Sequence, residues 1–95
     1  MNKYEAMFIT KSDISESKKK ALFDVIQDVI TKNEGKILSS SVWAEKKKLN
    51  FPIKKFHEAD YFLVNFELNP LKIISVKENY RLNEDILRLQ IIKEG

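Results

Sequence analysis

Six stretches of hydrophobic periodicity follow one another along the chain, and their order constrains the fold more than any other feature. Strand-like patterns cover residues 3–10, 36–49, 61–68 and 86–92, and a helical pattern follows the first and the third of them. The order strand, helix, strand, strand, helix, strand is that of the split βαβ motif. Right-handed crossovers place both helices on one face of such a sheet. We therefore predict an α+β, ferredoxin-like single domain over residues 1–95, with a four-stranded antiparallel sheet.

Local signals predict where the two helices begin and end. The first helix is expected to start at Asp13 or Ser15, since Asp13 and Glu16 have the spacing of a capping box, and to end at Gly35 in the left-handed conformation. Its apolar stripe comprises Leu22, Val25, Ile26, Val29 and Ile30. The second helix is expected to start at Asn69-Pro70, and its stripe comprises Ile73, Val76 and Tyr80.

The strand patterns also predict which side chains face the helices. Phe51-Pro52 is expected to end the second strand, and a loop through His57 to lead into the third. In the last strand, the residues predicted to face the helices are Leu87, Leu89 and Ile91. The opposite, helix-free face is predicted to hold Met7, Ile9, Tyr61, Leu63, Asn65, Arg88 and Gln90. A soluble monomer seldom leaves so many apolar side chains bare on one face.

The residue types indicate no catalytic function. The chain has no cysteine and a single histidine, His57, so thiolate and histidine-rich metal sites are excluded. We expect His57 to lie in a solvated loop. The chain has no glycine-rich phosphate loop and no Ser/His/Asp set. We therefore predict no catalytic residue, no metal, no cofactor and no small-molecule substrate. No apolar run approaches the ~20 residues of a membrane span, and no signal-peptide core is present, so we expect a cytoplasmic protein without a membrane partner.

Positive charge is concentrated in one segment. The net charge of +3 and the pI of about 9.1 favour nucleic-acid binding only weakly. Residues 46–55, however, contain no acid and five lysines: Lys46, Lys47, Lys48, Lys54 and Lys55. Such a cluster can contact RNA phosphates, or it can be the solvated, charge-protected edge of a sheet. Trp43 precedes the cluster, and core packing is favoured for it over base stacking. The lysines at 18–20 are expected on a solvated helix face.

Arg88 stands in an otherwise largely apolar strand. Burial of an unpaired guanidinium is very costly. Arg88 must therefore face solvent, a carboxylate such as Glu5 or Glu67, or a phosphate, and the residues alone leave these alternatives open.

Four stretches of sequence resemble the bacterial small-subunit ribosomal protein S-six family. They are Tyr4-Glu5 near the start and residues 49–55 (LNFPIKK), 59–67 (ADYFLVNFE) and 80–88 (YRLNEDILR), in the family's order. The resemblance implies a non-enzymatic protein of the small-subunit platform that binds 16S ribosomal RNA and assembles beside ribosomal protein S-eighteen. Residues and resemblance together give the candidate RNA-binding set Lys46, Lys47, Lys48, Lys54, Lys55, Arg81 and Arg88. The candidate partner-binding residues are Tyr61, Leu63 and Phe51.

Two features separate this chain from the family pattern. Lysines stand where the family has arginines, which removes bidentate phosphate geometry. The stretch from Trp43 to Leu49 is also one residue longer, which predicts a β-bulge there. The main alternative is an RNA-recognition-motif-like module for single-stranded RNA, with Tyr61 as a stacking aromatic, although its glycine-containing third-strand signature is absent. A small ferredoxin-like enzyme or ligand-sensing domain is the other, and it lacks a catalytic set.

Overall fold

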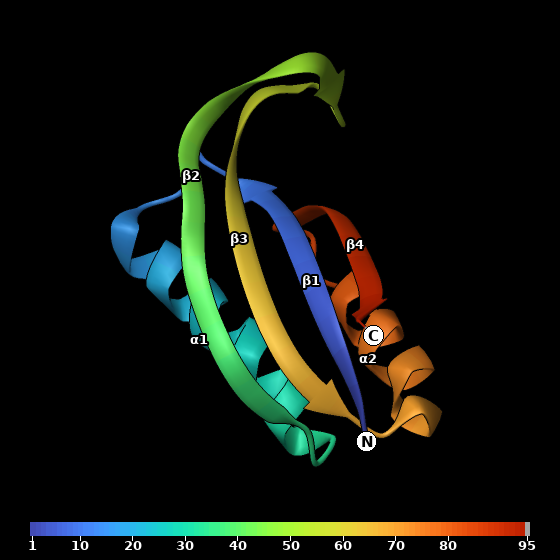
Figure 1. The fold of residues 1–95 in the computed structure, drawn as a ribbon. Coiled ribbons are helices and arrows are strands. Elements are labelled where there is room, and N and C mark those ends of the chain that lie inside the picture. Colours follow the sequence, from blue (N-terminus) through green and yellow to red (C-terminus); the bar gives the residue numbers. More distant parts are fainter. Residues whose placement is uncertain (95) are drawn as a thin grey trace.

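The computed structural model describes residues 1–94 and has the predicted split βαβ topology. The sheet is antiparallel with strand order β2-β3-β1-β4, and both helices lie behind it in Figure 1. The elements are β1 (Asn2–Lys11), α1 (Glu16–Lys32), β2 (Lys36–Ile53), β3 (Phe56–Leu68), the short 3-10 helix η1 (Pro70–Lys72), α2 (Ile73–Arg81) and β4 (Ile86–Glu94).

The core lies between the helices and the two central strands. Alternate side chains of β1 and β3 are buried, among them Phe8 and Phe66, against α1 and α2. The ring of Tyr80 from α2 packs edge-on against Phe8 at 4.8 Å, and its hydroxyl donates a hydrogen bond to the Ile26 carbonyl of α1. Burial raises the pKa of the Tyr80 hydroxyl. One side chain thus joins both helices to the sheet.

The ends of α1 differ in part from the prediction. Ser15 is the N-cap and accepts a hydrogen bond from the Lys18 amide at 3.3 Å, so the second of the two predicted caps is confirmed. At the other end, the left-handed residue is Glu34 (φ 65°). The prediction that Gly35 takes this conformation was therefore wrong. Gly35 is needed for close approach instead, because a Cβ there would lie 2.7 Å from Ile30 Cγ2 and 2.9 Å from the Glu67 carbonyl oxygen.

The apolar stripes of the helices are largely as predicted. Leu22, Ile26 and Ile30 are buried on α1, and Val76 and Tyr80 on α2. Val25 is the exception, since it is exposed at the margin of the stripe. Asn69 caps η1, the turn that leads into α2, by accepting a hydrogen bond from the Leu71 amide at 3.0 Å.

The second strand is longer than predicted, and only a two-residue turn separates it from the third. β2 continues through Phe51-Pro52 to Ile53, and β3 already includes His57. An edge strand tolerates proline because one side of its backbone makes no ladder hydrogen bonds. β1 pairs with β3 only as far as Ala59, so residues 48–58 extend past the sheet. We call this segment the arm; it curls over the top of the molecule in Figure 1.

The predicted faces of β4 are confirmed except at its start. Leu89 and Ile91 pack against the core, whereas Arg88 and Gln90 are exposed on the opposite face. The register with β1 shifts by one residue after Ile9 and skips Leu87. As a result Ile86, and not Leu87, belongs to the core cluster, although Leu87 is buried.

Candidate nucleic-acid interface

A bulge in β2 lies at the base of the arm. Ala44 is opposite Tyr61 and Lys47 is opposite Ala59, so two residues of β2 stand opposite Asp60 alone. Lys46, one of the two, has a left-handed backbone with φ 48°. The bulge predicted from the length of the Trp43–Leu49 stretch is therefore present.

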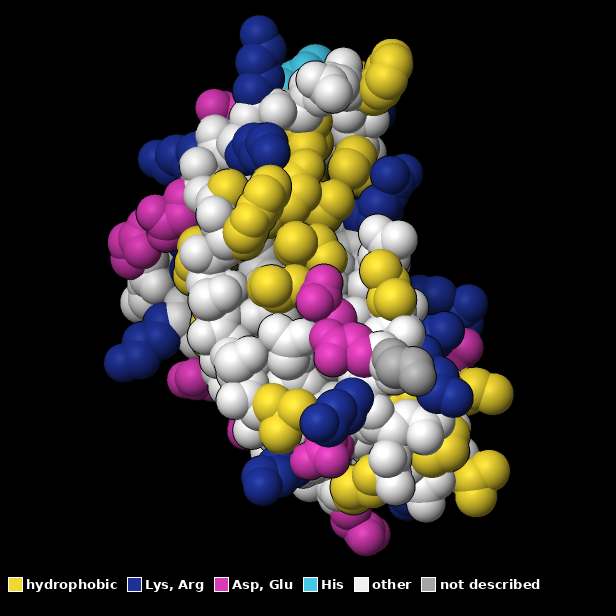
Figure 2. All heavy atoms as spheres, viewed as in Figure 1, with side chains coloured by type: hydrophobic (Ala, Val, Ile, Leu, Met, Phe, Trp, Pro, Cys, Tyr) yellow, Lys and Arg dark blue, Asp and Glu magenta, His cyan; other side chains and the backbone are white. Residues whose placement is uncertain are grey.

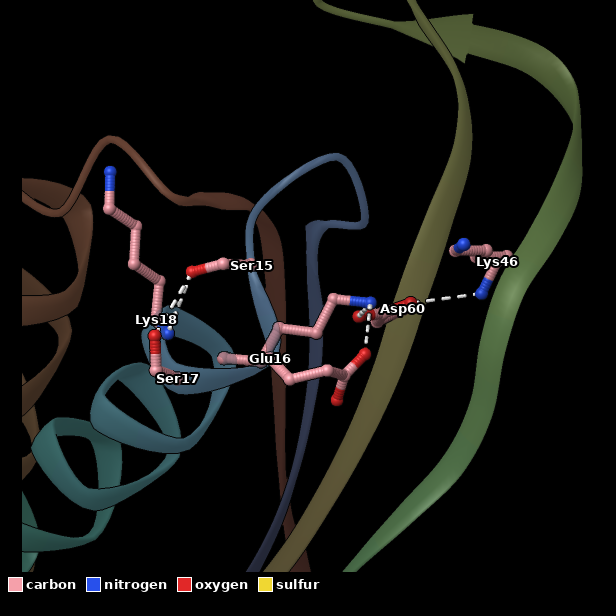
Figure 3. Close-up of polar contacts among 7 residues, drawn as sticks. Ser15, Glu16, Ser17, Lys18, Lys46 and Asp60 are labelled. Atoms are coloured by element: carbon pink, nitrogen blue, oxygen red, sulfur yellow. Dashed lines mark hydrogen bonds and ion pairs between the residues drawn. The ribbon is translucent and has the colours of Figure 1, made fainter.

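Asp60 holds this bulge from the side of β3. Its Oδ1 accepts a hydrogen bond from the Lys46 amide at 2.9 Å, and its Oδ2 lies 3.1 Å from Nζ of Lys19 in α1 (Figure 3). The side chains of Lys19 and Asp60 are only 14% and 10% exposed. Burial acts to lower the pKa of Lys19, but the hydrogen bond and charge of Asp60 outweigh it, so this pKa is raised.

The sequence did not reveal this contact. Lys19 was expected on a solvated helix face together with Lys18 and Lys20, and that expectation was wrong for Lys19 alone. Asp60 was expected in a charged loop. A signal was available, because Asp60 directly precedes the apolar alternation of β3, where a carboxylate with a nearly buried side chain requires a partner.

Two lysines form the tip of the arm. Ile53 pairs with Phe56, which leaves Lys54 and Lys55 as a two-residue turn, and both have positive φ, 48° and 73°. Turns of this kind favour Asn-Gly, because most side chains resist the left-handed region. Strained backbone often marks a functional position. Here the strain places two cations side by side at the most extended point of the hairpin.

Replacing the tip by the turn sequence it would ordinarily carry is expected to separate stability from binding. The double substitution Lys54→Asn and Lys55→Gly should raise the free energy of unfolding by about 1 kcal/mol, since it relieves two left-handed lysines. It should weaken binding to RNA because it removes two cations that can face phosphates. Chemical denaturation and RNA titration of the same sample measure both. A variant that binds RNA like the parent would exclude the tip from the interface.

A cleft opens between the tip of the arm, α2 and β4. It is lined by ten residues, four of them cationic and none acidic; the cations are Lys54, Lys77, Arg81 and Arg88. Arg81 also donates to Glu78 at 2.7 Å in an exposed pair on α2. No ion pair among residues 1–94 involves Arg88. The cleft therefore brings together three predicted RNA-binding residues and adds Lys77, which was not among the predicted site residues.

Lys47 points elsewhere, onto the helix-free face of the sheet. Its Nζ lies 4.3 Å from the ring centroid of Trp43 and 5.4 Å from that of Tyr61. The two rings are 5.5 Å apart and tilted by 60°. Trp43 is 56% exposed, so the prediction that it packs in the core was wrong. β2 is one of the two edge strands of the sheet and has only β3 beside it. Its side chains therefore have a neighbouring strand on one side only.

The helix-free face carries an apolar patch that includes two predicted partner-binding residues. β-pairing sets Met7 opposite Leu63 and Ile9 opposite Tyr61, with Trp43 beside them. Figure 2 shows these apolar side chains gathered over the upper half of the face, with lysines and arginines around the margin and acidic side chains below. Phe51, the third predicted residue, lies on the arm and is 81% exposed. We call Met7, Ile9, Trp43, Tyr61 and Leu63 the patch.

Other kinds of site find no support in residues 1–94. No three His, Cys, Asp or Glu side chains gather there as a metal ligand set. No helix in that part of the chain is long and apolar enough to cross a membrane. The two distinctive surfaces are the basic arm with its cleft and the apolar patch next to it.

Fold and surface together define the class: an α+β protein of split βαβ topology with a basic arm suited to nucleic-acid phosphates. Residues 3–93 match the sequence model of the family described as ribosomal protein S6, which is the S-six family. The small ribosomal subunit protein bS6 of Helicobacter hepaticus is 39% identical over 93 residues, covering 98% of this chain and 67% of that protein. That of Campylobacter curvus is 36% identical, covering 98% of this chain and 65% of its own length.

The structural comparison agrees with the sequence comparison. The crystal structure of 30S ribosomal protein S6 from Thermotoga maritima superimposes with a TM-score of 0.90 at 26% identity, covering 98% of this chain and 87% of that one. The chain belongs to the ribosomal protein S6 family, whose members are structural, non-enzymatic proteins of the small ribosomal subunit in the cytoplasm. It spans about 65% of the length of the Campylobacter curvus relative.

Proposed function

We propose that this protein binds 16S ribosomal RNA in the platform of the small subunit and does so together with ribosomal protein S-eighteen. The observation that carries the RNA assignment is the cleft between the arm and β4, with four cations and no acid in its lining. Phosphate contacts supply most of the affinity of such proteins and depend on charge more than on detailed geometry.

The arm and the cleft divide the phosphate contacts between them. Lys48, Lys54 and Lys55 lie on the arm, where their side chains are exposed. Arg88 lines the same cleft as Lys54, and its guanidinium can bind one phosphate in bidentate fashion. A strand of RNA backbone held between arm and sheet would neutralise both sets of cations at once.

The patch suits a protein partner better than a base. A stacking platform offers a free, flat aromatic face, but the ring of Trp43 is tilted against Tyr61 and covered by Lys47. Tyr, Trp and Met side chains are enriched in protein interfaces, and Trp and Tyr are frequent among the anchors that supply most of the binding energy. We therefore assign the patch to S-eighteen and the arm to RNA. We do not favour the RNA-recognition-motif-like alternative, in which Tyr61 would stack on a base.

Sedimentation of a cell lysate tests the proposal. At physiological magnesium, a tagged copy of the chain should sediment mainly with small ribosomal subunits. Treatment of the same lysate with ribonuclease should release it, because the RNA contacts dominate retention. A protein found only in the ribosome-free fraction before that treatment would contradict the proposal.

A further inference from the structure

We propose that Asp60 is a positioning residue for RNA binding: it fixes the bulge in β2 and thereby directs the basic arm over the cleft. The inference rests on the proposed function, because it concerns how the arm reaches RNA. Asp60 is nearly buried and is not expected to touch RNA itself.

The bulge is the point from which the arm takes its direction. A bulge bends its strand and increases the local twist. Here it lies level with the end of the β1–β3 ladder, where Lys11 pairs with Ala59. Past this level the hairpin has no neighbouring strand, and the pairing of β2 with β3 is irregular between Lys48 and Ile53. Beyond the ladder, β1 contacts the arm through Lys11, whose Nζ lies 5.6 Å from the centroid of the Phe56 ring. Because no ladder hydrogen bonds from β1 hold the arm, we infer that the geometry at its base sets its curled position.

Asp60 supplies what the bulged backbone lacks. Lys46 is in the left-handed region, which is unfavourable for a side chain with a Cβ. Its amide is satisfied by the Asp60 carboxylate at 2.9 Å. A hydrogen bond to a charged acceptor is stronger than one between neutral groups. Without an acceptor at position 60, the Lys46 amide would lose this hydrogen bond. The left-handed conformation of Lys46 would then lose the interaction that stabilises it.

Lys19 fixes the carboxylate in turn. Its Nζ lies 3.1 Å from Asp60 Oδ2, while the second acid near it, Glu16, is 3.8 Å away and largely exposed. Because Lys19 belongs to α1, the base of the arm is tied to a helix as well as to β3 (Figure 3). Helix α1 thus holds Asp60 through Lys19, and Asp60 holds the bulge from which the arm extends.

Two double variants isolate the hydrogen bond from the ion pair. Lys19→Met with Asp60→Asn keeps an acceptor for the Lys46 amide, and Lys19→Met with Asp60→Leu removes it. Each removes one positive and one negative charge, so both keep the parent's net charge of +3. Replacing a buried pair by apolar groups is often tolerated, and the apolar recess beside Asp60, lined by Leu22, Phe23 and Phe62, provides room for leucine.

We expect the leucine variant to bind a 16S ribosomal RNA fragment about tenfold more weakly than the asparagine variant, because only a fraction of its arms is correctly placed. The asparagine variant should stay within about threefold of the parent. Hydrogen exchange of the Lys46 amide should be at least about tenfold faster in the leucine variant alone. Thermal melting checks that both fold; if leucine is not tolerated, Asp60→Ala with Lys19→Met takes its place, since alanine also lacks the acceptor.

Equal RNA affinity of the acceptor-containing and acceptor-free variants would overturn the inference. So would an unchanged exchange rate at Lys46. A failure of the proposed function looks different, because the parent itself would then not bind the RNA fragment, and the positioning role would fall with it.

Discussion

Changing Lys46, Lys47, Lys48, Lys54 and Lys55 together to alanine is expected to lower the affinity for 16S ribosomal RNA by about 100-fold at physiological salt. All five side chains are exposed, and no ion pair among residues 1–94 uses any of them. Each lysine that binds a phosphate should, when removed, also reduce the slope of log affinity against log salt by about 0.7 to 0.9. Titration of an RNA fragment at several salt concentrations measures both quantities.

A matched comparison separates location from net charge. The triple change Lys48→Ala, Lys54→Ala and Lys55→Ala removes three positive charges from the arm. The triple change Lys18→Ala, Lys20→Ala and Lys32→Ala removes three exposed ones from α1, on the other side of the sheet. Only the first should flatten the salt dependence strongly. If the two triple variants are weakened equally, the arm is a solvated edge and the lysines act only through net charge.

Neither variant should unfold the protein. Exposed charges contribute little to stability, and the core between the helices and the central strands contains none of these lysines. Melting temperatures close to that of the parent are therefore expected, and a lowered RNA affinity can be assigned to the missing cations.

The fold could be predicted because its signals are local or periodic. β1 and β3 are covered by helices on one face, so buried and less buried residues alternate along both strands over most of their length. Asn69 and Ser15 are caps whose partners lie two and three residues away. Such features are encoded within a few residues, and a single sequence is enough to find them.

The errors arose where a distant segment decides the local structure. Pro52 suggested the end of a strand, but β2 is at the edge of the sheet and accommodates it. Gly35 suggested a left-handed residue, but it is required by the approach of Ile30 and the backbone of Glu67. Neither constraint is visible without knowing which strand lies beside which helix.

The candidate site shows the same division. The segment 46–55 was correctly singled out as basic, yet its lysines serve three different places: Lys46 at the bulge, Lys47 over Trp43, and Lys54 at the cleft. Alternation could not separate them, because a bulge changes the side to which each following residue points. The contact between Lys19 and Asp60 joins a helix to a strand, and no spacing rule predicts it.

A glutamate in the middle of the patch is expected to weaken binding of S-eighteen by about 100-fold, because an unpaired charge would be buried when the partner docks. We choose Leu63→Glu, since Leu63 is opposite Met7 on the helix-free face and only partly buried in the free protein. The free protein should stay folded, with the new carboxylate reaching solvent. Calorimetric titration of the chain with S-eighteen, on a 16S ribosomal RNA fragment, measures the decrease in affinity.

The matched control is Leu71→Glu. Leu71 is also an apolar residue, is 87% exposed, and lies on η1, outside the sheet. Both variants make the same chemical change and have the same net charge, so any general repulsion of RNA is equal in the two. Binding of RNA without the partner should therefore be alike, and only Leu63→Glu should fail to bind S-eighteen. Equal partner affinity in both would show that S-eighteen docks elsewhere, and the exposure of Trp43, Tyr61 and Leu63 would then require a different occupant.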